Sequence, residues 1–424
     1  MFTRRKLLTT GAAMAAASPF GFALPALAQT KKIKIGYVSP QTGPLSAFSA
    51  ADAYMVQKFL DAAPGLGLEV EVIVKDSQSN PNRAAEVAKE LISRDGVNLI
   101  LVASTPETTN PVCSVCEQEE IPVISTVAPW QPWFIGQQGN PGDPASWQPF
   151  DYVYHFFWGL EDNVGVFMNM WNSVETNKKV AALWPNDGDG NAWASDVGMP
   201  PALAAAGYEL TDPGRYQNLT DDFSAQINAF KQAGADIMVG IPIPPDFTTF
   251  WTQAKQQGFN PKLVSVAKAL LFPESVAALG DLGHNLTCEV WWSPAHPFTS
   301  SITGESAADM AAGFEAAAGR PWTMPVGFVH ALFEVAADAI KRTEDPTDGA
   351  ALAAAIGATN LDTVVGKVQW GRDNVPDFAR KNVSKTPLVG GQWRRKADGG
   401  FDLVIVENGL APEIPLGGTL ETLG

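Results

Sequence analysis

Short apolar runs alternate with helical patterns along the chain from Lys31 onward. The runs are rich in Val, Ile and Leu, as expected of strands buried on both faces, and the segments between them repeat apolar residues at helical spacing. The first series predicts strands at residues 33–39, 68–76, 97–103 and 121–126, with helices at 47–62, 81–94 and 107–119. Such alternation predicts βαβ units, and therefore a parallel sheet covered by helices on both faces.

The same kind of series recurs later in the sequence. It predicts strands at residues 179–184, 208–211, 236–241 and 262–266, with helices at 192–206, 220–234 and 245–258. The helix at 220 begins with Thr220-Asp221-Asp222, a typical N-cap sequence. Residues 129–149, between the two series, are rich in Pro, Gly, Gln and Trp and are expected to form a long surface loop rather than an element.

Two successive series predict an α/β fold with two doubly wound parallel-sheet lobes joined by hinge strands. Beyond Trp292 the pattern predicts helices at 306–318, 326–342 and 347–358, then strands at 365–370, 389–394 and 401–406. A chain that returns to helices after its second unit is expected to be shared between the lobes. We therefore expect residues 29–154 and 291–361 to form one lobe, and residues 155–290 and 362–424 to form the other.

The N-terminus has the pattern of an export signal. Arg4 and Arg5 precede an uncharged run over residues 7–28, which ends in Ala26-Leu27-Ala28, a small-x-small cleavage site. Paired arginines are typical of a twin-arginine signal, and the alternative is a single transmembrane anchor. Prolines within the run favour cleavage, so residues 1–28 are expected to be removed. No later apolar run is long enough to span a bilayer, so we expect a soluble periplasmic protein without stable membrane insertion.

Charge and cysteine content disfavour several classes of function. The formal net charge of −16 repels nucleic-acid phosphates and anionic lipid surfaces, so no nucleic-acid partner is expected. Cys113 and Cys116 form a Cys-x-x-Cys pair, but they lie inside a predicted helix rather than at its first turn, where a redox thiol is activated. We interpret them as small buried helix residues. Whether they form a disulfide stays open, and redox catalysis is the alternative.

No metal, cofactor or catalytic site is expected. Asp187-Gly188-Asp189-Gly190-Asn191 imitates the start of a calcium loop, but Ala192 stands where that loop needs Gly, and Gly198 where it needs Glu. The His residues are scattered, which gives no support to a zinc site. No nucleophile elbow, phosphate-binding loop or dinucleotide motif occurs, so the chain is not expected to be an enzyme.

The first strand and the segments that follow it resemble a known family. Residues 33–48, IKIGYVSPQTGPLSAF, and residues 76–81, DSQSNP, are similar to the opening of type I periplasmic solute-binding proteins of the leucine/isoleucine/valine-binding family. Residues 119–125, 222–224 and 233–236 agree as well. The resemblance implies a hinged clamp that captures a small-molecule ligand in the periplasm and delivers it to the membrane permease of an ABC importer.

The resemblance also implies ligand-binding positions, which follow the strands of both lobes. In open parallel sheets, ligands bind beyond the carboxyl ends of the strands. The positions that match or replace those of the family, together with nearby hydroxyls and tryptophans, are Phe48, Ser104, Thr105, Thr108, Ser125, Val127, Trp130, Asp189, Trp193, Ile243 and Lys268. The alternative for each hydroxyl is a plain N-cap, and for each tryptophan a place in the core.

One departure from the family changes the expected ligand. The acidic residue that answers an ammonium group in the family falls at Ala267, beside Lys268. A desolvated ammonium without a carboxylate costs several kcal/mol, so a plain branched-chain amino acid is not expected. Lys268 in the cleft would instead favour a carboxylate, and its alternative is a solvated lysine on a loop. Asp187 or Asp189 in the ammonium role would keep an amino acid or amide open.

The abundance of tryptophan, 13 residues, favours a flat or bulky ligand. We therefore predict a non-enzymatic periplasmic receptor for a small solute: an amino acid or, more in keeping with the altered site, a carboxylate, an aromatic compound or an amide. The alternative is an exported α/β enzyme or a sensory ligand-binding module.

Overall fold

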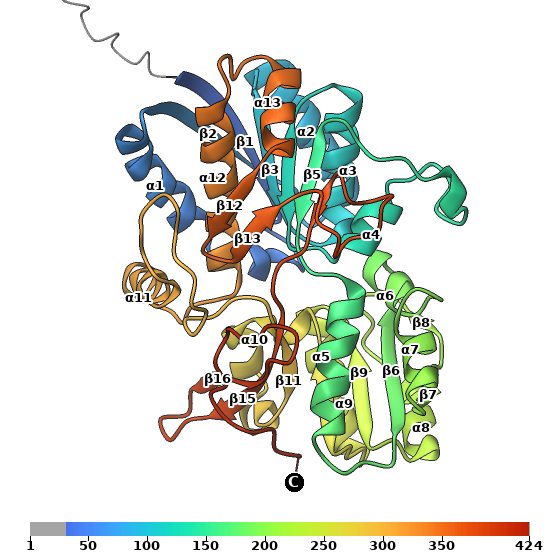
Figure 1. Ribbon diagram of the computed structural model, residues 1–424. Coiled ribbons are helices and arrows are strands. Elements are labelled where there is room, and N and C mark those ends of the chain that lie inside the picture. Colours follow the sequence, from blue (N-terminus) through green and yellow to red (C-terminus); the bar gives the residue numbers. More distant parts are fainter. Residues whose placement is uncertain (1–30, 424) are drawn as a thin grey trace, which may run out of the picture. The chain divides into compact units, whose positions relative to one another are not determined.

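The computed structural model describes residues 31–423, so the expected signal at residues 1–28 lies outside the described residues. The chain after Lys31 forms two α/β lobes, each built around its own sheet (Figure 1). Among the helices of the described residues, none is both long and apolar enough to cross a bilayer.

The first lobe contains a six-stranded sheet with the order β14-β5-β4-β3-β1-β2, in which every pair is parallel. Its strands are β1 (Lys31–Ser39), β2 (Leu68–Asp76), β3 (Leu99–Ala103), β4 (Val123–Thr126), β5 (Val153–Phe156) and β14 (Val383–Ser384). Because successive side chains point to opposite faces, Leu99 and Leu101 enter one core cluster, whereas Ile100 and Val102 enter another. The strand is therefore apolar throughout.

Helices cover both faces of this sheet. One face carries α1 (Asp52–Ala62), α11 (Ala307–Ala318), α12 (Pro325–Arg342) and α13 (Gly349–Gly357), and the other carries α2 (Pro81–Glu90) and α3 (Pro106–Gln118). The start of α2 is fixed locally, since Asn80 accepts hydrogen bonds from the backbone N–H groups of Asn82 and Arg83, and Pro81 occupies the first helical position. The expected doubly wound architecture is confirmed.

The second lobe repeats this order and adds an antiparallel edge. Its main sheet runs β16-β15-β11-β10-β9-β6-β7, and the short strand β8 (Arg215–Tyr216) also pairs with β6. The parallel strands are β6 (Lys179–Pro185), β7 (Glu209–Thr211), β9 (Ile237–Gly240), β10 (Leu263–Val266) and β11 (Thr287–Val290); β15 (Val389–Arg395) and β16 (Phe401–Glu407) are antiparallel. The helices are α5 (Leu160–Asn172), α6 (Gly188–Trp193), α7 (Met199–Ala205), α8 (Ser224–Ala233), α9 (Pro244–Gln256) and α10 (Pro273–Ala277).

The chain passes between the two sheets three times. The first passage follows β5, the second follows β11, and the third lies between β14 and β15. A hairpin of β12 (Asn360–Thr363) and β13 (Gly366–Gln369) precedes β14. Strand β14, residues 383–384, pairs with β5 of the first lobe. The sequence pattern instead placed residues 362–424 in the second lobe. Two residues of strand are too short to give a periodic signal, which explains the difference.

Several sequence expectations need correction. Residues 129–149 are not simply a loop, because α4 (Trp130–Ile135) buries Trp133 and Phe134 there. The helix expected at 192–206 is divided into α6 and α7. The helix expected at 220 begins at Ser224, and Asp222 accepts a hydrogen bond from the Ser224 N–H, so the polar cluster forms the turn before the helix. Neither β5 nor α5 was predicted from the sequence.

The Cys-x-x-Cys pair lies inside α3, as expected. Cys113 and Cys116 are buried, and neither forms a disulfide within the described chain. Burial raises the pKa of the Cys113 thiol to about 12, so the reactive thiolate is disfavoured at neutral pH. The pair is a structural feature of the helix.

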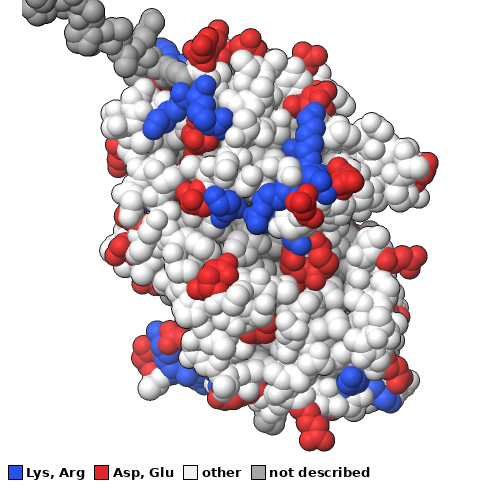
Figure 2. All heavy atoms as spheres, in the orientation of Figure 1, with Lys and Arg blue, Asp and Glu red and all other residues white. Residues whose placement is uncertain are grey.

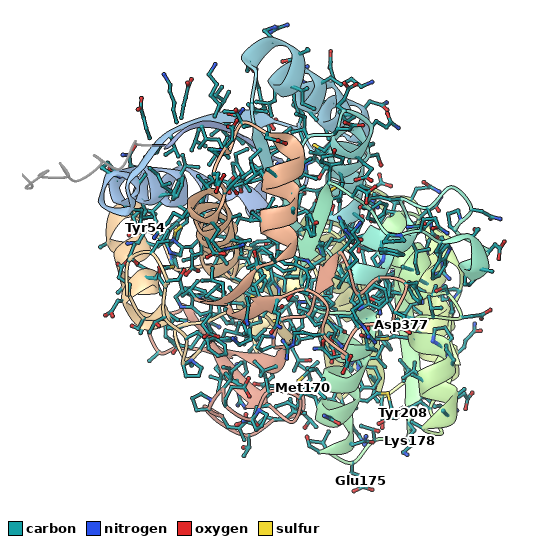
Figure 3. All side chains as sticks on the ribbon, turned by 45° about the horizontal axis from the view of Figure 1, so that its top comes forward. Tyr54, Met170, Glu175, Lys178, Tyr208 and Asp377 are labelled. Atoms are coloured by element: carbon teal, nitrogen blue, oxygen red, sulfur yellow. The ribbon has the colours of Figure 1, made fainter. Side chains whose placement is uncertain are left out.

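Charged side chains of both signs are interspersed over the face shown in Figure 2. Lys385, for example, pairs with Glu161 at 2.8 Å and with Asp162 at 2.7 Å. In the second lobe, Figure 3 shows Lys178 and Tyr208 beside each other, and the Lys178 Nζ lies 5.2 Å from the Tyr208 ring centroid. These are ordinary surface interactions of modest energy.

Candidate functional site

The loops after the strands of both lobes meet at one small cavity. Its volume is about 20 Å³. The first lobe contributes residues that follow β1, β3, β4 and β5, and the second contributes residues at or beyond the ends of β6, β9, β10 and β11. The lining residues are Phe48, Thr105, Val127, Pro129, Phe157, Trp158, Asp189, Ile241, Lys268, Leu271, Glu289 and Trp291. This is the edge at which doubly wound sheets bind ligands.

Aromatic side chains form much of the cavity wall. Phe157 lies 4.8 Å from Trp158 and 5.3 Å from Trp291, measured between ring centroids, and the contact with Trp291 is edge-on. Phe48 is held by an edge-on contact of 4.9 Å with Phe272. Rings fixed in this way present apolar faces for a flat or apolar ligand, and such faces also attract cations.

Lys268 enters the cavity as part of a buried ion-pair cluster. Its Nζ lies 2.7 Å from Asp189 Oδ2 and 3.2 Å from Asp187 Oδ2, and all three side chains are at most 6% exposed. Asp187 is also fixed by α6, because its Oδ1 accepts a hydrogen bond from the Gly190 N–H at 2.8 Å. The alternative of a solvated lysine is therefore wrong. The expectation of a free cation for a ligand carboxylate also needs revision, since two aspartates already balance this charge.

Five polar atoms around the cavity have no hydrogen-bond partner among residues 31–423. They belong to side chains that line the cavity and are at most 2% exposed. The acceptors are oxygens of Asp189 and Glu289, the hydroxyl is that of Thr105, and the donors are the indole N–H groups of Trp158 and Trp291. Because buried polar groups are normally paired, these atoms make the cavity a candidate ligand site.

The pKa values of both acids and of the lysine in this cluster are raised, so their protonated forms are favoured. Burial raises the pKa of Glu289 to about 8, and the backbone N–H of Lys268 and the nearby Asn163 side chain oppose the rise. Burial raises the pKa of Asp189 to about 7, partly offset by the attraction of Lys268. Burial disfavours the charged form of Lys268, but Asp187 and Asp189 outweigh it, so the Lys268 pKa is raised as well. All three shifts reflect a buried site with more carboxylates than cations.

Two residues of the cavity have unusual backbone conformations. Val127 has a φ of 73° and Lys268 a φ of 60°. This region is unfavourable for residues with a Cβ, especially a β-branched one, and costs about 1–3 kcal/mol per residue. Val127 directly follows β4, and Lys268 lies two residues beyond the end of β10. The fold therefore maintains strained backbone on both sides of the site.

Of the residues proposed from the sequence, Phe48, Thr105, Val127, Asp189 and Lys268 line the cavity. Ser104 and Thr108 do not line it, and the Thr108 hydroxyl donates to the Ser104 hydroxyl at 2.7 Å. Both side chains are buried.

The remaining proposed residues have other partners. Ser125 bonds to the ring of His155 at 2.8 Å, and the Trp130 indole donates to Glu161 at 3.2 Å. Trp193 packs against Trp184 and Phe167 within the second lobe. Ile243 precedes α9, and Ile241 lines the cavity in its place.

The sequence analysis missed Glu289, the most informative residue of the site. One signal was present, because Glu289 is an isolated acid in the apolar strand Thr287-Cys288-Glu289-Val290. A carboxylate in such a strand requires a partner or a function. Phe157 and Trp158 were missed because the strand β5 that precedes them was not predicted.

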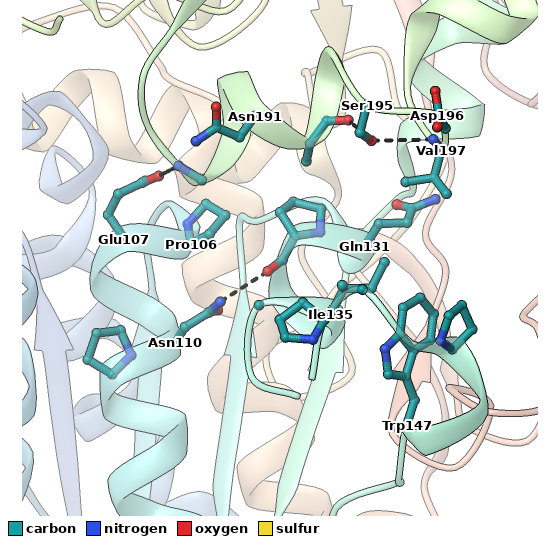
Figure 4. Close-up of a pocket in the computed structure, with 18 residues that line it drawn as sticks. Pro106, Glu107, Asn110, Gln131, Ile135, Trp147, Asn191, Ser195, Asp196 and Val197 are labelled. Atoms are coloured by element: carbon teal, nitrogen blue, oxygen red, sulfur yellow. Dashed lines mark hydrogen bonds between the residues drawn. The ribbon is translucent and has the colours of Figure 1, made fainter. Parts of the chain in front are cut away.

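A larger, mainly apolar cavity of about 900 Å³ lies beside the site (Figure 4). Its walls come from α3, α4 and residues 141–147 of the first lobe, and from residues 188–197 of the second. Between the lobes, Glu107 Oε1 accepts a hydrogen bond from the Gly188 N–H at 2.7 Å (Figure 4). This bond joins the two lobes directly and is compatible only with a closed arrangement.

Two similar lobes, three connections and a ligand cavity at the facing strand ends define a class of proteins that enclose a small ligand between two lobes. Comparison with known families is consistent with this geometry. Residues 32–377 match the family model described as "Periplasmic binding protein", and the chain belongs to this family. No match was found among curated protein sequences.

Solved structures with the same fold include several binding proteins of ABC transporters. A leucine-binding protein from Thermotoga maritima has a TM-score of 0.71 and 18% identity, over 89% of this chain and 99% of that one. A branched-chain amino acid binding protein from Streptococcus pneumoniae, in complex with isoleucine, has a TM-score of 0.68 and 17% identity, over 89% and 100%. A solute-binding protein from Rhodopseudomonas palustris, in complex with 3,4-dihydroxybenzoic acid, has a TM-score of 0.69 and 19% identity, over 91% and 99%.

Proposed function

We propose that this chain is the periplasmic substrate-binding component of an ABC importer of the branched-chain amino acid type. It captures a small solute between its lobes and presents the closed form to a membrane permease. The observation that carries the proposal is the cavity at the facing strand ends, where five buried polar atoms lack partners among the described residues. Membership of the periplasmic binding protein family supports the same function.

The proposed mechanism is a shift between open and closed arrangements. A ligand that contacts both lobes stabilises the closed arrangement by its differential contacts. Thr105 and Phe157 offer contacts from the first lobe, and Asp189 and Glu289 offer contacts from the second. Because the closed cavity measures only about 20 Å³, a solute larger than a few atoms requires the lobes to close less tightly around it.

The aromatic walls favour a solute with a flat or apolar body. The R. palustris relative in complex with an aromatic acid and the S. pneumoniae relative in complex with isoleucine show that this fold accepts either kind of body. At under 25% identity, neither complex determines the solute of this chain. The choice rests on the polar groups of its own cavity.

The proposed function is tested with the purified mature chain and a panel of amino acids, aromatic acids, amines and amides. A ligand should raise the melting temperature, reduce the radius of gyration measured by small-angle scattering, and be recovered unchanged. Chemical conversion of the ligand would contradict a transport receptor and favour an exported enzyme. Stabilisation without compaction would contradict the clamp.

A further inference from the structure

We infer that the solute carries a positively charged amine or amidinium group, which binds to Glu289 and Asp189, and that it lacks a carboxylate. The inference rests on the proposed function, because it takes the cavity between the lobes to be the ligand site. It replaces the aromatic or bulky carboxylate that the sequence suggested. The two readings make opposite predictions about the charge of the ligand.

The charge balance of the site favours a cation. Among the residues lining the cavity, Lys268 is the single basic side chain within the described part of the protein, and Asp189 and Glu289 are the two acids. Asp187 adds a third carboxylate, since it also pairs with Lys268. One buried cation therefore faces three buried carboxyl groups, whose ionised forms outnumber it. A ligand cation reduces this imbalance, whereas a ligand carboxylate increases it in a region of low dielectric constant.

The unpartnered atoms lead to the same conclusion. The free oxygens of Asp189 and Glu289 are acceptors when these groups are ionised, and their residues are 2% and 1% exposed. An ammonium group offers three donors, and a carboxylate offers none. A carboxylate ligand would find donors at Thr105 and the two indoles, and at Glu289 only while that group holds a proton, and it would place its charge beside Asp187 and Asp189. An unpaired buried acceptor is costly.

The surrounding rings suit a cation as well. Phe48, Phe157, Trp158 and Trp291 line the same cavity as the two acids. Aromatic faces attract cations, and recognition of ammonium ligands by groups of aromatic rings is a recurring arrangement. The rings therefore serve both the apolar body and the charged group of such a ligand.

The pKa shifts support the inference and give it a pH signature. With its pKa raised to about 8, Glu289 holds a proton at neutral pH, and Asp189 is partly protonated with a pKa of about 7. Glu107, Asp187 and Lys268 face Asp189, and Asn163 and Asp189 face Glu289. A bound cation favours the ionised acids, so it should release protons. Affinity for the cation should therefore rise as pH increases through 7 and 8.

A panel matched in shape tests the charge of the ligand. Phenethylamine, phenylalanine, 3-phenylpropionate and 3-phenylpropanamide share one ring and differ in their charged groups, and benzylamine with benzoate gives a shorter pair. We expect the amines to raise the melting temperature, to bind at least about 10-fold more tightly than their matched acids and phenylalanine, and to release protons in calorimetry. Equal or tighter binding of a carboxylate or of phenylalanine would overturn the inference, and so would a lack of stabilisation by either amine.

Variants test the residues. Glu289→Gln should weaken binding of the stabilising amine by about 10- to 100-fold, because a charge-assisted contact is lost. Glu334→Gln is the matched control: Glu334 is a buried glutamate whose pKa burial raises to about 7, but it bonds to Ser301 and Val364 and does not line the cavity. Unchanged affinity in Glu289→Gln would overturn the inference. A carboxylate enclosed between the lobes and recovered unchanged would overturn it while leaving the proposed function intact.

Discussion

Replacement of Lys268 by methionine tests whether this lysine is a structural countercharge or a receptor for a ligand anion. The lysine is 3% exposed and lies 2.7 and 3.2 Å from the carboxylates of Asp189 and Asp187. Lys268→Met keeps most of the side-chain volume and leaves two buried carboxylates without their cationic partner. Breaking a buried pair in this way costs about 3–5 kcal/mol, so we expect the free energy of unfolding to fall by that amount at about pH 8.

The penalty should depend on pH with a definite sign. Without the attraction of Lys268, the pKa of Asp189 should rise further in the folded state, so the native protein binds more protons than the unfolded chain. Stability then falls as pH rises from the unfolded pKa, about 4, towards the folded value. The loss caused by Lys268→Met should therefore be smaller at about pH 5 than at about pH 8. Urea denaturation at both pH values measures it.

A matched control separates burial from charge. Lys396 also lies within 4.0 Å of two carboxylates, those of Asp398 and Asp402, but its side chain is 43% exposed and theirs are 71% and 63% exposed. Lys396→Met should therefore cost only about 1 kcal/mol or less. If Lys268→Met costs no more than this control, the lysine is not a buried countercharge. Lys268 would then be available to bind an anionic ligand, and the assignment of a cationic solute would lose its main support.

Three further changes test other parts of the structure. Glu107→Ala removes the bond to the Gly188 N–H, so it should weaken ligand binding by about 3- to 10-fold. It should also increase the radius of gyration of the unliganded protein in small-angle scattering. An unchanged affinity together with an unchanged radius would contradict the role of Glu107 in closure. Burial raises the pKa of Asp52 to about 7, so its contribution to stability falls as pH rises from about 4 to about 7. Asp52→Asn should remove this pH dependence, and an equal dependence of the urea-denaturation free energy on pH in the two proteins would contradict it. Gly327→Ala would place a Cβ against the Trp292 ring, and we expect thermal denaturation to show a loss of about 1–3 kcal/mol; a stable variant would mean that this ring moves freely.

The fold was predictable because its signals are local. Strand β2 is rich in Val and Ile, and β6 is mostly apolar, and the bounds of both agree with the sequence pattern to within one residue. The missed elements have mixed signals. Helix α4 contains Pro132 and two tryptophans, and only its packing against the first lobe makes it helical. Intrinsic propensity and periodicity determine the secondary structure of long periodic segments, whereas tertiary contacts determine that of short ones.

The site was less predictable because it depends on distant pairs. Lys268 and Asp187 are 81 residues apart in the sequence, and no local pattern shows that they meet. The sequence allowed a solvated lysine or a lysine facing a ligand anion, and the structure shows a buried lysine with two carboxylate partners. Residues carried over by resemblance, such as Phe48 and Val127, line the cavity, but their meaning for the ligand depends on charges that only the folded chain brings together.

The position of Glu289 connects the altered site with the family. The resemblance places the acidic position of the family at Ala267, just beyond β10. Ser265 of β10 pairs with Thr287 of the parallel strand β11, so two residues further along the same register Ala267 stands opposite Glu289. A carboxylate absent from one strand end is thus present at the same level on the neighbouring strand. Because parallel strands end at a common edge, this shift keeps an acid at the ligand cavity while directing it from a different side. If the solute is a cation as we propose, Glu289 supplies the acceptor for its ammonium group, and the paired lysine leaves little reason to expect a carboxylate beside it.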